Sequence, residues 1–88
     1  MVVLISEYQR PLDEVDVHRE AHLAFLAGLR ERGLIVVSGR RKPPVGGIVV
    51  LDVGSVEEAE AIMAEDPFAA SGVAVYEPYE FTPTKPPS

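Results

Sequence analysis

The spacing of apolar residues along the chain alternates between the short period of a strand and the longer period of a helix. Apolar and β-branched runs that are typical of strands cover residues 2–8, 34–38, 47–53 and 73–81. Apolar positions recur at helical spacing after the first run, and a shorter helical pattern follows the third run. The chain therefore predicts the order strand, helix, strand, strand, helix, strand.

The first helix is predicted over residues 14–32, with one apolar stripe along it. Asp13 is expected to be its N-cap and Gly33 its C-cap. His22 lies at the angular centre of the stripe and is therefore expected to point inward. At about 100° per residue, the stripe contains Val15, His18, His22, Phe25, Leu26 and Leu29.

Capping residues and prolines mark the elements of the second half. Ser55 followed by Glu58 matches a capping box and predicts the start of a helix. This helix must end near Asp66, because Pro67 disfavours helical backbone in the residue before it. Pro78 cannot donate to a strand ladder, so the last strand is expected at a sheet edge or at a bulge. Prolines and glycines between the second and third strands predict an antiparallel hairpin.

This element order is that of an α+β, ferredoxin-like βαββαβ fold. In it, two helices cover one face of a four-stranded antiparallel sheet and leave the other face bare. Continuous apolar runs such as residues 2–5 and 48–51 predict that the bare face is apolar, so we expect a homodimer packed through the sheet faces. Residues 1–82 form this domain, and residues 83–88 are expected to be a disordered, proline-rich tail.

Composition narrows the possible function classes. The chain has 88 residues, no cysteine and a formal net charge of −6. Disulfides, thiolate metal sites and cysteine nucleophiles are therefore excluded, and nucleic acid and anionic membranes are poor partners. The N-terminal apolar run over residues 2–5 is too short for a signal peptide or a membrane span, which predicts a cytoplasmic protein.

His22 and Asp66 are the candidates for proton-transfer chemistry. A histidine with one wet edge, titrating near neutral pH, is the usual agent of proton transfer. Asp66 lies where Pro67 fixes the backbone, and a carboxylate that reached His22 from there would orient the imidazole and fix its tautomer. The alternatives are a satisfied core histidine and an aspartate that only ends a helix, and the spacing leaves both open.

His18 precedes His22 by one helical turn, a spacing that would allow both to bind a metal ion. Asp66 would then be the third ligand. The glutamate between the two histidines occupies neither the position of H-E-x-x-H nor that of H-x-x-E-H, so the metalloprotease motif is not reproduced. We therefore expect no metal and no cofactor, with a zinc or iron hydrolase as a remaining alternative.

Basic residues gather around one hairpin. Residues 1–44 carry seven basic and six acidic side chains, whereas residues 45–88 carry one basic and eight acidic side chains. Ser38 and Gly39 end the second predicted strand, and Arg40 opens the basic run that follows. Such a run is usually a solvated loop, but it could also attract an anionic substrate to this end of the sheet.

Several short motifs resemble the YCII-related domain (YciI-like) family. They span almost the whole chain: Arg19-Glu20-Ala21-His22-Leu23, Phe25-Leu26, Leu29, Gly33-Leu34, Ser38-Gly39, Asp66-Pro67-Phe68, Gly72-Val73 and Tyr79. The R-x-x-H-L and D-P-F motifs are the most specific of these. The resemblance implies a ferredoxin-like domain that dimerises into an α/β barrel, in agreement with the fold predicted from the pattern.

The resemblance also implies an active-site pair and a cleft. The expected catalytic residues are His22 and Asp66, and the expected substrate-binding residues are Arg19, Ser38, Gly39, Arg40 and Phe68. A relative of this family acts as a dehydrochlorinase in chloroaromatic breakdown. Many members have glycine and proline after the second strand where this chain has basic residues, so a relative's substrate cannot be transferred.

Two functions remain in view. The first is a small cofactor-independent enzyme that uses the His22–Asp66 pair for proton transfer, as an isomerase, lyase or dehydrochlorinase-like enzyme, on a small anionic or aromatic compound. The alternative is a non-catalytic dimeric module for ligand binding or interaction, in which the two residues form a buried structural pair. Access from solvent to His22 separates them.

Overall fold

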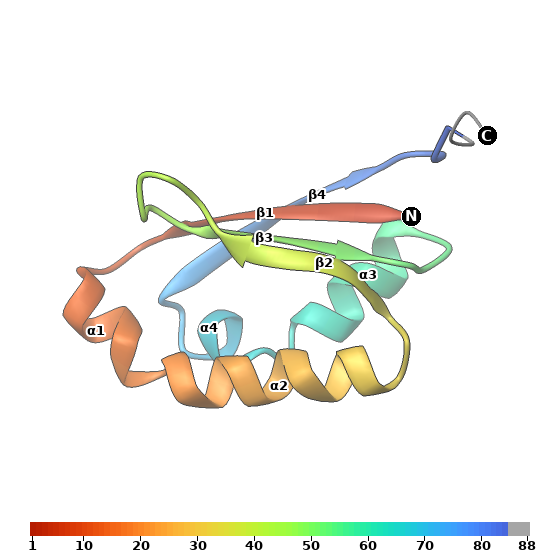
Figure 1. Ribbon diagram of the computed structural model, residues 1–88. Coiled ribbons are helices and arrows are strands. Elements are labelled where there is room, and N and C mark those ends of the chain that lie inside the picture. Colours follow the sequence, from red (N-terminus) through yellow and green to blue (C-terminus); the bar gives the residue numbers. More distant parts are fainter. Residues whose placement is uncertain (85–88) are drawn as a thin grey trace.

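The protein, described here by a computed structural model of residues 1–84, is built on one antiparallel sheet. Its elements are β1 (Val2–Tyr8), α1 (Leu12–Val17), α2 (Arg19–Glu31), β2 (Ile35–Arg40), β3 (Gly47–Leu51), α3 (Val56–Met63), α4 (Pro67–Ala70) and β4 (Ala74–Glu80). The strands pair in the order β2-β3-β1-β4. Figure 1 shows α1 to α4 on the same side of the sheet. The predicted ferredoxin-like α+β architecture is confirmed, and β4, which carries Pro78, is an edge strand.

The proline-rich end of the chain is only partly described. Residues 81–84 follow β4 without regular secondary structure and are exposed. The disordered tail predicted for residues 83–88 falls mainly on residues 85–88, which lie outside the described residues.

Burial alternates along the strands and separates a helix-covered face from an open face. In β1 the buried Val2 and Leu4 alternate with the half-buried Val3 and Ile5, because successive side chains of a strand point to opposite faces. The helix-covered face packs against α2 and α3. The buried core between them comprises Val2, Leu4, Leu26, Leu29, Val49, Leu51, Val53, Ala59 and Met63.

The open face carries an apolar surface that no helix covers within residues 1–84. Strand register places its residues in neighbouring rows across the sheet. At its two edges, Val37 is 58% exposed and Tyr79 is 47% exposed. The apolar residues of the open face are Val3, Ile5, Val37, Ile48, Val50, Val75 and Tyr79, and the acidic Glu7 and Glu77 lie on the same face.

The single helix predicted over residues 14–32 is wrong, because the chain leaves helical geometry at His18. Asp13 is not its N-cap; Pro11 holds that position, and Asp13 lies in the first turn of α1. The break lets α1 bury Val15 in a second cluster beside Phe68, while α2 packs on the main core. The β-branched and aspartate residues of α1 also favour helix weakly, so tertiary packing decides the boundary.

The first helical region ends close to the predicted residue, but Gly33 is not the C-cap. Arg32 is the C-cap of α2, and Gly33 follows it with φ 75°. The backbone N–H of Gly33 donates to Arg30, and that of Leu34 donates to Leu29. This is a Schellman motif, which requires a left-handed residue that glycine adopts without strain.

Proline has a second effect in the connection between α3 and β4. Ser55 caps α3 as predicted and accepts a hydrogen bond of 3.1 Å from the backbone N–H of Glu58. The helix ends at Met63, before Asp66, and Pro67 then begins the short helix α4 where a loop was expected. Proline favours the first position of a helix because it has no N–H to leave unpaired there.

The connection between β2 and β3 is held against β1 by a close backbone contact. Val45 accepts a 2.7 Å hydrogen bond from the backbone N–H of Tyr8. A Cβ on Gly46 would lie 1.8 Å from the carbonyl oxygen of Ser6, so only glycine fits at this position. The predicted hairpin is confirmed, but β2 continues to Arg40, so Ser38 lies within the strand and not at its end.

Candidate active site

His22 lies beside Asp66 although the two residues are far apart in the sequence. Its Nδ1 atom is 2.7 Å from Oδ1 of Asp66. The imidazole stacks on Phe68, with 3.9 Å between ring centroids and 5° between the ring planes. His22 itself is 9% exposed. Helix α2 therefore places the imidazole against both a carboxylate and an aromatic ring at the α3–α4 junction.

Asp66 is fully buried and has a hydrogen-bond partner for each carboxylate oxygen. Oδ1 meets His22, and Oδ2 accepts a 2.6 Å hydrogen bond from the hydroxyl of Tyr76. Its backbone is extended before Pro67, and its carbonyl accepts the first hydrogen bond of α4 from Ala70. Asp66 is the N-cap of α4 without a side-chain cap bond, because its carboxylate is turned to His22 and Tyr76.

The expected substrate-binding residues surround one cavity of about 150 Å³ that reaches His22. We call this cavity the His22 cleft. Asp66 lies behind the imidazole and does not line it. The residues that do line it include His22 and all five sequence candidates, Arg19, Ser38, Gly39, Arg40 and Phe68. Solvent access to the imidazole, which separates a catalytic pair from a sealed structural pair, is therefore present.

The two arginines of the cleft differ in their partners. Arg40 lies 3.3 Å from Asp16 and donates a 3.2 Å hydrogen bond from Nε to the hydroxyl of Tyr8. That hydrogen bond raises the pKa of Arg40 above its ordinary value. Arg19 is half-buried and makes no side-chain hydrogen bond or ion pair with any residue in the described range 1–84. Arg19 therefore supplies the unpaired positive charge of the cleft.

The other expected contacts support the site in different ways. Ser38 accepts a hydrogen bond of 3.3 Å from Arg30. Phe68 is 3% exposed, because His22 covers one face of its ring and Tyr8 meets it edge-on at 6.0 Å. Phe68 therefore holds the imidazole in place more than it offers a free surface. Contacts of these residues with a substrate stay a prediction.

The metal-binding alternative gains no geometric support. His18 lies at the junction of α1 and α2 and is half-buried. Across residues 1–84, no group of three histidine, aspartate or glutamate side chains is arranged to hold a metal ion. The helical spacing of two histidines is thus present without a third ligand close enough to complete a site.

Tyr76 was not expected among the site residues. It lies opposite Ser6 in the β1–β4 ladder and points, like its neighbour two residues before, to the helix-covered face. Burial and the hydrogen bond to Asp66 raise the pKa of Tyr76 well above its ordinary value. The alternation of β4 could have placed Tyr76 on this face, but its hydrogen bond depends on where α4 begins.

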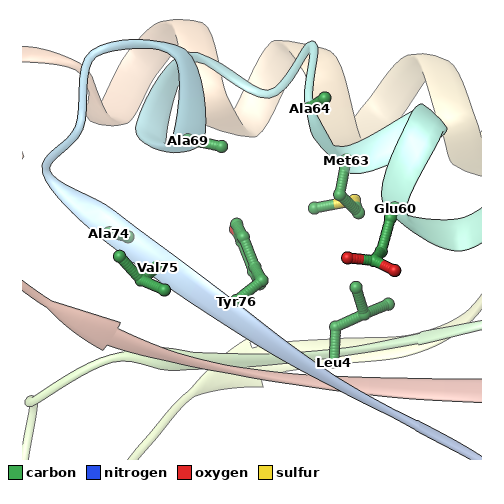
Figure 2. Close-up of a pocket in the computed structure, with 8 residues that line it drawn as sticks. All are labelled: Leu4, Glu60, Met63, Ala64, Ala69, Ala74, Val75 and Tyr76. Atoms are coloured by element: carbon green, nitrogen blue, oxygen red, sulfur yellow. The ribbon is translucent and has the colours of Figure 1, made fainter.

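A second cavity, of about 250 Å³, is also lined by Tyr76. Figure 2 shows it between β4 and the two short helices, with Met63 and Glu60 projecting from α3 and Leu4 from β1. Tyr76 lines both this α3–β4 pocket and the His22 cleft. Tyr76 therefore belongs to the walls of both cavities.

Comparison with solved structures finds similarity over nearly the full chain. A dehydrochlorinase of 5-chloro-2-hydroxyhydroquinone from Burkholderia phenoliruptrix AC1100, solved with 2,5-dihydroxybenzoquinone, is 24% identical and has a TM-score of 0.75. The match covers 93% of this chain and 94% of the other, and it establishes a shared fold. The comparison with curated proteins gives no match.

Within the described residues, no helix has the length and apolar character needed to cross a bilayer.

The sequence also matches a family model, which agrees with the motifs around His22 and Asp66. The match to the model of the YCII-related domain extends over residues 1–82. The chain therefore belongs to the YCII-related domain family.

Proposed function

We propose that this protein is a small cofactor-independent enzyme in which His22 moves a proton on a small anionic or aromatic compound. The observation that carries the proposal is the 2.7 Å contact between His22 and a fully buried Asp66 at the wall of a cavity. Isomerisation, elimination and lyase reactions all use such a proton transfer. A positioned general base or acid contributes about 10²–10⁴-fold in rate.

Hydrogen-bond chemistry assigns the role of each nitrogen. Both oxygens of a carboxylate can only accept hydrogen bonds, so we propose that Nδ1 of His22 carries the proton shared with Asp66. Nε2 then keeps its lone pair and is the nitrogen available to a substrate. With Phe68 stacked on the ring, the imidazole has little freedom to turn away from Asp66. Asp66 thus acts through His22, as the carboxylate of a catalytic triad does.

The size and charge of the cleft support a small ring compound with a negative charge. A cavity of about 150 Å³ is large enough for a benzene ring. Arg19 precedes His22 by one helical turn and lines the same cavity without a partner among residues 1–84. A substrate carboxylate or phenolate would satisfy this guanidinium. The structural neighbour is named for a chlorinated hydroxyhydroquinone, a small ring compound whose hydroxyl groups can ionise to phenolates.

The test uses chlorinated hydroxyhydroquinones and hydroxybenzoquinones as probes. Chloride release and exchange of carbon-bound hydrogen with deuterated solvent would be measured by ion chromatography and NMR. We expect wild-type protein to catalyse at least one of these reactions, His22→Gln to lose about 10²–10⁴-fold, and Asp66→Asn to lose activity because its amide would impose the other tautomer. Asp52→Asn, an exposed aspartate outside the cleft, is the matched control.

Two results would count against an enzyme. Unaltered turnover in His22→Gln would remove the imidazole from the reaction. A wild-type protein that binds the probes, with shifted His22 resonances, but never exchanges hydrogen or releases chloride would favour the dimeric ligand-binding module.

We also infer that two copies pack through the open face. The support is the apolar surface formed there by Val3, Ile5, Val37, Ile48, Val50 and Tyr79. Exposed apolar patches of this kind on a small domain mark interaction sites, and a domain this short gains much of its stability from a partner.

A further inference from the structure

Tyr76 and His22 share the two oxygens of one carboxylate. The hydroxyl of Tyr76 is 2.6 Å from Oδ2 of Asp66, and Nδ1 of His22 is 2.7 Å from Oδ1. Within residues 1–84, no arginine or lysine pairs with this carboxylate. The hydrogen-bonding of the fully buried Asp66 side chain therefore depends on these two neighbours.

A buried carboxylate with too few donors becomes a stronger base. Removal from water disfavours its charged form, and each hydrogen bond donated to it favours that form again. With only one donor, Asp66 would take up a proton from solvent more readily. The protonated carboxyl would then donate to Nδ1 of His22, and the imidazole would carry its own proton on Nε2. The second hydrogen bond, from Tyr76, favours the ionised carboxylate and so disfavours this state.

We propose that Tyr76 is a positioning residue that keeps the proton on Nδ1 of His22, and the lone pair on Nε2, by donating its hydroxyl to Asp66. This inference rests on the proposed function, because it gives His22 the tautomer of a general base. Tyr76 acts through Asp66 and is not required to touch the substrate.

The chemistry of the phenol fits this role. Burial and the hydrogen bond to Asp66 raise the pKa of Tyr76, so the hydroxyl keeps its proton throughout the neutral range. It therefore never places a second negative charge beside the carboxylate. The phenol can donate one hydrogen bond, and Asp66 accepts it.

Packing alone does not explain the hydroxyl. Figure 2 shows the Tyr76 ring beside the α3–β4 pocket, with Met63 and Leu4 on one side and Ala69 beyond the ring's far end. This pocket of about 250 Å³ leaves room next to the ring. Phenylalanine would occupy nearly the same volume and lose only the hydrogen bond, which makes Tyr76→Phe a clean substitution.

The decisive measurement is the nitrogen NMR spectrum of the His22 imidazole at neutral pH. In wild-type protein we expect Nδ1 to show the shift of a protonated nitrogen and Nε2 that of an unprotonated one. In Tyr76→Phe the two shifts should move toward each other as the tautomers mix. Tyr8→Phe removes another hydroxyl of the cleft, one that meets Arg40 and not Asp66, and should leave both shifts unchanged. Unchanged shifts in Tyr76→Phe would overturn the proposal.

Kinetics provide a second readout with the probes of the proposed function. Loss of one hydrogen bond to a charged group should lower kcat by about tenfold to a hundredfold. KM should change by less than about twofold, since uniform binding is untouched. Equal kcat values for wild-type protein and Tyr76→Phe contradict the role of Tyr76 even if His22→Gln is inactive.

The outcomes separate this inference from the proposed function. If no probe reacts but the nitrogen shifts respond to Tyr76→Phe alone, the positioning role stands and the enzyme proposal fails. If Tyr76→Phe does not fold, the wild-type protein is still informative. A slowly exchanging, downfield Tyr76 hydroxyl proton that couples to the Asp66 carboxylate supports the inference, and a freely exchanging one contradicts it.

Discussion

The two faces of the sheet differ in the side chains that they bury and expose. The helix-covered face carries polar side chains at Ser6, Tyr76 and the adjoining Asp66, and each has a hydrogen-bond partner. The open face is apolar at Val37 and Ile48, which remain exposed in the single chain. A small domain can therefore bury polar groups where every one is paired, and it leaves apolar residues where a second surface can cover them.

Truncation of adjacent residues in β1 gives the largest expected difference between the two faces. Leu4 is 1% exposed on the helix-covered face, so Leu4→Ala should lower the free energy of unfolding by about 2–5 kcal/mol. Ile5 is half-buried on the open face, and Ile5→Ala should cost about 1 kcal/mol or less in dilute protein. Urea unfolding measures both. Equal losses in dilute protein would mean that the faces do not differ as the burial pattern indicates.

The proposed interface makes the cost of Ile5→Ala depend on protein concentration. If the open face is covered in a dimer, the difference between wild-type protein and Ile5→Ala should grow as concentration rises. For Leu4→Ala, whose side chain lies in the core of one chain, the loss in the free energy of unfolding should not depend on protein concentration. This series therefore separates burial within one chain from burial between two.

A charge on the open face should prevent association without unfolding the chain. Val37 is 58% exposed, so Val37→Lys should leave the monomer's free energy of unfolding within about 0.5 kcal/mol. A dimer through this face should weaken by at least about tenfold, or about 1.4 kcal/mol, measured by sedimentation velocity. Val17→Lys adds the same charge at a 77% exposed site in α1 and should have no such effect. A wild-type chain that stays monomeric at every concentration would disprove the interface.

Two tyrosines of β4 lie on opposite faces of the sheet and should affect the pH dependence of the free energy of unfolding differently. The pKa of Tyr76 is raised in the folded state, chiefly by burial, so its stabilising contribution is fully present below about pH 10. At higher pH the unfolded chain loses the phenol proton first, and the free energy of unfolding should fall by up to about 1.4 kcal/mol per pH unit.

The comparison is between single substitutions measured from pH 9 to 11. Tyr76→Phe should remove this part of the alkaline loss of stability. The pKa of Tyr79 is also raised, by a hydrogen bond with Glu77, but in the single chain this phenol is solvated on the open face. Tyr79→Phe should therefore change the pH dependence much less. An equal effect of the two substitutions would contradict the difference in burial.

Most of the fold was predictable because its signals are local. The strand periods, the Ser55 cap and the left-handed Gly33 each depend on a few neighbouring residues, and these agree with the structure. The break at His18 and the helix α4 were missed because packing sets both. Val15 is buried in the cluster that contains Phe68, and α1 must therefore turn away from the axis of α2.

The candidate site was predictable in its residues but not in its connections. The centre of the apolar stripe predicted His22, and the residue before a proline predicted Asp66. The structure has their side chains 2.7 Å apart, and their catalytic role stays a prediction. Tyr76 was missed because a strand tyrosine has no local mark of its partner. The sequence also did not show that Arg40 is paired and Arg19 is not, because Arg40 pairs with Asp16, which is distant from β2 in the sequence.

The uncapped start of α4 has a consequence for motion around the imidazole. Because the Asp66 side chain does not cap this four-residue helix, nothing from that residue shields its first amides. Amide hydrogens there should exchange with solvent faster than those in the middle of α2. Asp66 and Phe68 flank Pro67, so each local opening of α4 would displace both residues. The imidazole would then lose its hydrogen bond and its stacked ring in the same event, and the geometry of the proposed site would be lost until α4 re-formed.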